Sequence, residues 1–406
     1  MELKTKYQYT YFIYPYIIDE KDYRKYIENL LKKSNCKLKI FESKKDVGIT
    51  SYFLPEMQEK MFWTLDLKRE ALKEYMKMDK QVKATLLSQK ECNIFEFEID
   101  NEIQGKVGEQ DGIFFSIGDI QIVCFKTGVC FLVMKTTINS SNSFSDVLNF
   151  NYKFRDIYSQ LTHTKEYENI KIQTEQFKDI KKISEVIREI VGPNTLSKQI
   201  NLDTNRFITY AYTCIDQAHW NENSTEDIVN TQFKKYKMVQ YAEEQLNDSL
   251  KEKNDTYEEK YLKIGFEPES VTLLTTDINI KNYTILPHDF ENKYLYHYIF
   301  NLYKKVYLKK INYEINQKKT FLSVKEKFIT FAKKDWIIEI TNNNLGISLE
   351  KEFQKQQMLG EIFFKLKNKY DILYKDCEIE KNKKYSKWIL TIVIILLIIG
   401  IFNLLK

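Results

Sequence analysis

The side chains of this chain that could do chemistry include six cysteines and four histidines. Two cysteines with two residues between them (CxxC) are typical of zinc sites and of disulfide-exchange sites. No such pair occurs among the six, which are Cys36, Cys92, Cys124, Cys130, Cys214 and Cys377. His288 and His297 are too far apart in sequence to form a metal-binding pair on one helical face. The sequence therefore predicts no zinc site and no histidine-bound metal.

Cys124 and Cys130 are a pair that the local pattern does bring together. They lie in IQIVCFKTGVCFLVMKT, where two apolar runs flank Lys126, Thr127 and Gly128. Such a pattern is typical of a β-hairpin with a three-residue loop and a left-handed glycine. In that register Cys124 faces Cys130. The pair is interpreted as two small core side chains, with a cross-strand redox pair as the alternative.

The glycines before this hairpin give no sign of a phosphate-binding loop. Gly105, Gly108, Gly112 and Gly118 are not followed by Lys-Ser/Thr, and the pattern opens no helix there. They predict turns, with a ligand-binding loop as the alternative. The sequence has neither a GxSxG nor an HExxH motif. The chain is therefore not predicted to be an enzyme, and binding, self-association and action at a membrane are favoured.

The chain ends in one apolar segment that is long enough to cross a bilayer. The chain closes with KYSKWILTIVIILLIIGIFNLLK, which has no charged side chain between Trp388 and Leu405. At about 1.5 Å per residue this stretch spans about 27 Å, close to the hydrocarbon thickness of a membrane. A single transmembrane helix is predicted over residues 388–405.

The residues before this segment predict its orientation. Lysines crowd its N-terminal side, so the positive-inside rule places the bulk of the chain in the cytoplasm and the protein, single-pass, in the cell membrane. The net charge of +5 is too small and dispersed for a nucleic-acid partner, and the lysine cluster suits anionic lipid headgroups. The predicted membrane-interface anchors are Lys383, Lys384, Tyr385, Lys387 and Trp388.

Three residues interrupt the aliphatic character of the segment: Thr391, Gly400 and Asn403. One interpretation is ordinary helix packing with Asn403 near the far interface. The other is that the three residues line a pore built by several copies of the chain.

The rest of the chain predicts an α+β fold. Residues 1–143 form a mixed α/β cytoplasmic domain, in which YQYTYFIYPYII (Tyr7 to Ile18) is a buried strand with Pro15 near an end or a bulge. Residues 144–345 are predicted to be mainly helical and cytoplasmic. Residues 346–387 form a stalk helix, continuous from about Ser348 into the membrane and about 55 Å long before it.

The stalk carries a seam of apolar residues at spacings of 4, 3, 4, 3 and 4: Leu359, Phe363, Leu366, Tyr370, Leu373 and Cys377. This mean spacing of 3.5 residues is what self-association of helices requires. The seam is therefore interpreted as an oligomer contact. Packing against earlier helices of the same chain is the alternative.

In this order of parts the chain resembles the CorA family of divalent-cation channels. The stretch EKEFQKQQMLGEIFFKLKNKYDILYKDCEIEKNKKYSKWIL occupies the place of that family's stalk and pore helix, and KNKYDILYKD resembles the CorA-like proteins that accompany type III CRISPR systems. The resemblance implies a homopentamer, a divalent cation, and gating by a nucleotide messenger in antiviral defence. The family's Gly-Met-Asn motif and second membrane helix have no counterpart in this sequence, so magnesium selectivity does not carry over.

These observations predict an oligomeric membrane effector whose cytoplasmic domain senses a signal and whose C-terminal helices form a pore or perturb the bilayer. The alternative is a tail-anchored adaptor or receptor whose last helix is only an anchor. A membrane-tethered enzyme is the third possibility.

Overall fold

The structure is a computed structural model that describes residues 2–98, 103–107, 112–139, 141–157, 171–173, 181–192, 197–200, 202–217, 220, 223–242, 256–317, 321–336 and 339–404. It divides into two units, which are described separately. The first unit comprises Met1–Tyr307 and Ile338–Gln357, and the second comprises Leu308–Ile337 and Met358–Lys406. The described chain is a mixture of helices and strands with one long apolar helix at its C-terminal end, in agreement with the predicted α+β class.

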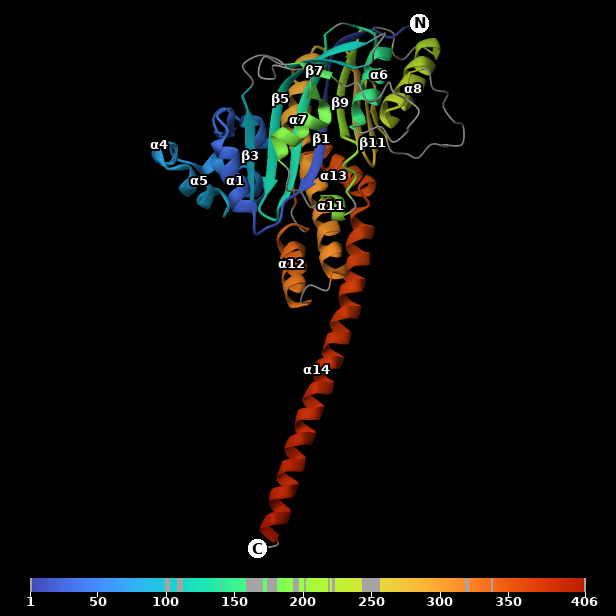
Figure 1. Cartoon of the computed structure of the whole chain (residues 1–406). Coiled ribbons are helices and arrows are strands. Elements are labelled where there is room, and N and C mark those ends of the chain that lie inside the picture. The colour runs from blue at the N-terminus through green and yellow to red at the C-terminus, as the bar shows by residue number, and fades with distance from the viewer. Residues whose placement is uncertain are drawn as a thin grey trace. The chain divides into compact units, whose positions relative to one another are not determined.

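The first unit is built on one mixed β-sheet (Figure 1). Along its main path the strand order is β10-β11-β12-β9-β1-β6-β5-β4-β7-β8, while β3 pairs with β5 and β2 pairs with β3. The paired strands are antiparallel except for β12 and β9, which are parallel. The strand bounds are β1 Thr5–Ile17, β2 Cys36–Leu38, β3 Cys92–Phe97, β4 Ile103–Val107, β5 Ile113–Phe125, β6 Val129–Ile138, β7 Lys171–Gln173, β8 Lys181–Lys182, β9 Ile208–Ile215, β10 Thr256–Glu259, β11 Leu262–Glu267 and β12 Ser270–Thr276.

Helices connect these strands and continue after the sheet. In the first unit they are α1 Tyr23–Lys32, α2 Val47–Tyr52, α3 Pro55–Met61, α4 Arg69–Lys77, α5 Lys80–Leu87, α6 Phe144–Arg155, α7 Ile183–Val191, α8 Asn223–Met238, α9 Lys281–Thr284, α10 Leu286–Asp289 and α13 Asn344–Gln356. A π-helical turn, Phe290–Tyr294, leads into α11 Leu295–Asn316, whose residues from Leu308 belong to the second unit. The second unit also holds α12 Phe321–Lys334 and α14 Leu359–Leu404.

Strand β1 lies inside the sheet, as its aromatic and β-branched sequence predicts. Successive side chains of a strand point to opposite faces of the sheet, and β1 has buried side chains on both faces. On one face Phe12 packs against Phe154 of α6, with ring centroids 4.3 Å apart. On the other face the Tyr9 hydroxyl donates to the Pro287 carbonyl at 2.6 Å. Pro15 lies beyond the last residue of β1 that pairs with β9, where its missing N–H costs no ladder bond.

The predicted hairpin is confirmed. Strands β5 and β6 flank a three-residue turn in which Gly128 has a φ of 80°, and Cys124 pairs with Cys130 across the strands. Both side chains are fully buried. Burial, followed by the hydrogen bond and charge interaction with Cys130, raises the pKa of the Cys124 thiol well above its ordinary value. The thiol therefore stays protonated, which supports the interpretation of the two cysteines as core side chains.

The middle of the chain, residues 144–345, contains the helices α6 to α12, and it also contains strands that the sequence did not predict. Strands β7 to β12 extend the sheet of the N-terminal residues. The sequence ITYAYTCI of β9 explains the difference, because a run of aromatic and β-branched residues favours a strand buried on both faces. Gly192 ends α7 with a φ of 87°, the left-handed conformation that glycine commonly takes after the last turn of a helix.

Candidate membrane-inserting helix

Helix α14 is the element that carries the predicted membrane segment. It is continuous over 46 residues, from Leu359 to Leu404 (Figure 1). The expected stalk, continuous from about Ser348, is corrected here, because α13 ends at Gln356 and Met358 takes a φ of 53°. The part of α14 before Trp388 is therefore 29 residues, or about 44 Å, rather than about 55 Å.

The first turns of α14 pack inside the second unit, along the predicted seam. Phe363 stacks on Trp336 with ring centroids 4.1 Å apart and 11° between the planes. Phe328 of α12 contacts Phe363 at 5.5 Å and Tyr370 at 5.4 Å. These contacts agree with the alternative interpretation of the seam, in which it packs against earlier helices of the same chain. The seam's contact with another copy stays a prediction.

Other seam positions are oriented in the same direction along α14. Leu359 and Leu366 are buried, and Leu373 and Cys377 are partly buried. The Lys369 ammonium donates to Asn312 Oδ1 at 3.0 Å, and Lys325 lies 4.9 Å from the Tyr374 ring. From Glu378 to Ile401 every side chain of α14 is exposed.

The predicted interface anchors follow on this exposed part of the helix. Lys383, Lys384 and Lys387 are exposed, and Tyr385 and Trp388 are 66% and 70% exposed. Two aromatic rings with polar atoms next to three ammonium groups are a combination that suits the headgroup layer. The structure thus places all five anchor residues within about two helical turns.

The segment after Trp388 is apolar and exposed around the whole helix. Among the described residues, this single helix is long and apolar enough to cross a bilayer, and its apolar window has no buried part. The last predicted residue of the span, Leu405, lies outside the described residues. A helix with no polar face and no protein neighbour is stable in a medium that is itself apolar, because every backbone group is bonded within the helix.

The three candidate pore residues do not share one face of α14. Thr391 and Gly400 are nine residues apart, which at 100° per residue puts them on opposite sides of the helix. Gly400 and Asn403 are about 60° apart and share a side. The Thr391 hydroxyl donates to the Lys387 carbonyl at 2.8 Å, so it is satisfied within its own helix. Gly400 and Asn403 can therefore face a common pore axis, whereas Thr391 cannot face that axis together with both of them.

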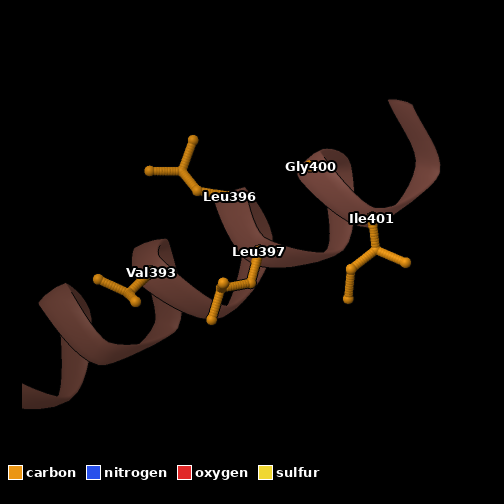
Figure 2. A pocket seen from close by; sticks show the side chains of 5 residues that line it. All are labelled: Val393, Leu396, Leu397, Gly400 and Ile401. Carbon is orange, nitrogen blue, oxygen red and sulfur yellow. The ribbon is translucent and has the colours of Figure 1, made fainter. Parts of the chain in front are cut away.

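Gly400 opens a shallow apolar notch on the helix surface (Figure 2). Its other lining residues are Val393, Leu396, Leu397 and Ile401. A Cβ added at Gly400 would meet nothing within 4 Å, so the notch is open space on this helix. A small residue among bulky aliphatic ones is the surface feature that lets two membrane helices approach closely.

A buried polar cluster holds α13, the helix that precedes α14. The Glu350 carboxylate of α13 receives His297 Nε2 at 2.6 Å and Asn301 Nδ2 at 2.5 Å, both from α11. The Lys304 ammonium lies 3.4 Å from Glu350 Oε1. Because a carboxylate only accepts, His297 carries its proton on Nε2, and in the neutral ring Nδ1 accepts from the Tyr52 hydroxyl at 2.8 Å. We call these five residues the Glu350 cluster.

The electrostatics of this cluster favour the charged carboxylate. Burial raises the pKa of Glu350, but the hydrogen bond from His297 and the charge of Lys304 outweigh it, so the pKa lies well below the ordinary value. His297, Asn301 and Lys304 are themselves almost completely buried. No local spacing pattern in the sequence indicates this cluster, because 53 residues separate His297 from Glu350. Within the described residues, no three His, Cys, Asp or Glu side chains are arranged to hold a metal ion.

Comparison with protein-family models, curated proteins and solved structures finds no match for this chain.

Proposed function

We propose that the protein is an oligomeric, single-span membrane effector: its cytoplasmic sheet domain senses a signal, and its C-terminal helices assemble to open or perturb the bilayer. The observation that carries this proposal is the continuity of α14. One helix begins among packed aromatic rings, passes through a basic and aromatic girdle, and ends as an exposed apolar span. Such a helix links events in an aqueous domain to lipid without an intervening loop.

Assembly is part of the proposal for a physical reason. One apolar helix encloses no water, so a conducting path needs several copies around an axis. The side of α14 that bears Gly400 and Asn403 offers a close-packing notch and one polar side chain for that axis. The resemblance to CorA-type channels supplies the remaining parts of the proposal: a pentamer, a transported cation, and a nucleotide messenger acting in antiviral defence.

The second candidate is a tail-anchored adaptor or receptor. Two observations favour it: the first part of the seam is occupied by α12 of the same chain, and Thr391 and Gly400 face opposite directions. In this case α14 holds the sheet domain near the membrane and the bilayer stays sealed.

Replacing the span distinguishes the two candidates. A chain in which residues 388–404 are exchanged for a polyleucine helix keeps its hydrophobic length and loses the notch and Asn403. The full-length protein and the exchanged chain are reconstituted in vesicles loaded with potassium and magnesium ions. The effector proposal predicts ion release from vesicles with the native span and none from vesicles with polyleucine, at equal insertion. If vesicles with either protein release no ions and the protein is a monomer in detergent, the effector proposal is contradicted and the tail-anchored adaptor or receptor is favoured.

A further inference from the structure

A pocket with a volume of about 320 Å³ lies in the first unit, between α1 and the end of α7. The residues that α1 and its two caps contribute recur every three or four positions, so they lie along one side of the helix. They are Asp22, Lys25, Tyr26, Asn29, Leu30 and Lys33. The other lining residues are Ile18 and the end of α7, from Arg188 to Gly192. Small-molecule sites have volumes of about 300–1,000 Å³, so this pocket suits a compact organic ligand.

Hydrogen bonds within the chain hold the two helices around this pocket. The Lys33 ammonium at the end of α1 donates to the Glu189 and Ile190 carbonyls, each at 2.8 Å. These carbonyls lie in the last turn of α7, where a helix leaves acceptors free and a cation is favourable. The Tyr26 hydroxyl is hydrogen-bonded to the Tyr16 hydroxyl at 2.6 Å, which fixes the ring at the wall. The wall is therefore largely preformed, as in most small-molecule sites.

The wall carries more positive than negative charge. Its cations are Lys25, Lys33 and Arg188, and its carboxylates are Asp22 and Glu189. Glu189 is paired with Lys181, which does not line the pocket. Among the described residues, neither Lys25 nor Arg188 pairs with a carboxylate. The three cations and Asp22 together leave the wall with a formal excess of two positive charges.

We propose that this pocket binds a small organic phosphate ester, with the phosphate at Lys25 and Arg188 and an apolar body against Tyr26 and Ile190. A phosphate monoester carries about 1.5 to 2 negative charges at pH 7, which matches the excess of the wall better than the single charge of a carboxylate. An arginine guanidinium can donate two parallel hydrogen bonds to phosphate oxygens. Burial lowers the pKa of Lys33, and a bound anion offsets that cost.

The ligand is soluble rather than part of a lipid. Lipid headgroups also carry phosphate esters, but a pocket of about 320 Å³ leaves little room for two acyl chains. The pocket gives the sensing role of the sheet domain a place and a ligand class, and in that respect the inference rests on the proposed function. Binding itself requires neither assembly nor ion release, so the two proposals can fail separately.

Equilibrium dialysis of the full-length protein in detergent tests the site, with 1-naphthyl phosphate as the probe and the same detergent on both sides. We expect one probe molecule to bind per chain. In competition with the probe, 1-naphthol and inorganic phosphate each present one half of it. Each should bind at least about tenfold more weakly, because the charged or the apolar contacts are lost. Dihexanoyl phosphatidate joins the same phosphate group to two acyl chains and should also bind at least about tenfold more weakly.

Three variants locate the binding. Lys25→Ala with Arg188→Ala removes two cations of the wall and should lower the affinity for the probe at least about tenfold. Lys73→Ala with Lys77→Ala on α4 is the matched control, since it removes two exposed cations outside the pocket and should leave the affinity unchanged. Asn29→Trp keeps the charge of the wall but fills the pocket, so it should also lower the affinity at least about tenfold. All five substituted side chains are exposed, so we expect each variant to fold.

The inference is overturned if the native chain does not bind the probe, if the two double variants bind it equally, or if Asn29→Trp binds it as the native chain does. Equal binding of dihexanoyl phosphatidate and the probe would contradict a soluble ligand. If the native chain binds the probe but releases no ions from vesicles, the effector proposal is contradicted and the phosphate ester site is not.

Discussion

Glu350 shows how a single side chain can determine the position of a helix. Its carboxylate is 17% exposed and receives hydrogen bonds from His297 and Asn301, with Lys304 next to it. Buried groups of this kind are expensive to leave without a partner, and here the Glu350 carboxylate has a donor on each of its two oxygens. The cluster therefore contributes less to net stability than to the choice of one position for α13.

Removing the charge of Glu350 gives a prediction at the same scale. Glu350→Gln should lower the free energy of unfolding of the first unit by about 2–4 kcal/mol, because His297 and Lys304 lose their charged acceptor. Glu361→Gln is the matched control: this exposed carboxylate lies 3.4 Å from Lys365 on the surface of α14, where such a pair contributes less than about 0.5 kcal/mol. Urea unfolding at pH 7, followed by tryptophan fluorescence, to which buried Trp220 contributes, measures both variants. Equal losses in the two variants would contradict the role of the cluster.

The low pKa of Glu350 adds a pH dependence. A carboxyl whose folded-state pKa is depressed contributes stability above its unfolded pKa of about 4.3 and loses it as the pH falls toward the folded value. The difference in unfolding free energy between the native chain and Glu350→Gln should thus be largest near neutral pH and shrink below about pH 4. Unfolding curves from pH 7 to pH 3 check this. A constant difference would show that the carboxylate charge is irrelevant.

At the scale of elements, α14 has two contrasting sides in its first turns. Phe363 stacks on Trp336, while its neighbour Phe364 is 61% exposed. Phe363 therefore packs within the chain, whereas Phe364 is available for contact with other molecules.

Phe363 and Phe364 form a matched pair of substitutions. Phe363→Ala should destabilise the packing of α12 against α14 by about 2 kcal/mol, since a half-buried stacked ring is lost. Phe364→Ala should change it by less than about 0.5 kcal/mol. Hydrogen exchange of the α12 amides measures the effect. If Phe364→Ala instead lowers the oligomer mass in detergent, copies meet on the exposed side of α14 rather than along the seam.

How well the sequence predicts each element depends on the range of the interactions that form it. The β5–β6 hairpin and the apolar span are set by residues close in the chain, through turn geometry at Gly128 and hydrophobic length after Trp388. The residues of β9 favour a strand, but its place in the sheet could not be predicted, because its partner β1 lies about two hundred residues earlier. The break at Met358 was not predicted either, although Gly360, two residues later, is a poor helix former.

The candidate site was predicted in part for the same reason. The anchors from Lys383 to Trp388 follow one another on a single helix, so composition alone indicates their shared place. The three candidate pore residues were grouped by polarity and size, and the helical rotation between Thr391 and Gly400 separates them. The Glu350 cluster unites residues from α2, α11 and α13, and a pattern of local spacing cannot reveal it.

For the whole molecule, we expect the sheet domain to lie on one side of the membrane and the residues after the span on the other. By the positive-inside rule, the lysines at 381, 383, 384 and 387 predict that the domain lies on the cytoplasmic side. In inside-out vesicles a protease should therefore digest the sheet domain, and in right-side-out vesicles it should leave the domain intact. Digestion in right-side-out vesicles only would reverse the orientation.

Flotation of cell membranes measures whether α14 holds the chain in lipid. Membranes from cells that produce the full-length protein are washed with alkaline carbonate and floated on a density gradient, next to membranes from cells that produce a chain ending at Lys387. We expect the full-length protein to float with the lipid after the wash and the shortened chain to stay in the aqueous fractions. Release of the full-length protein by carbonate, or flotation of the shortened chain, would contradict it.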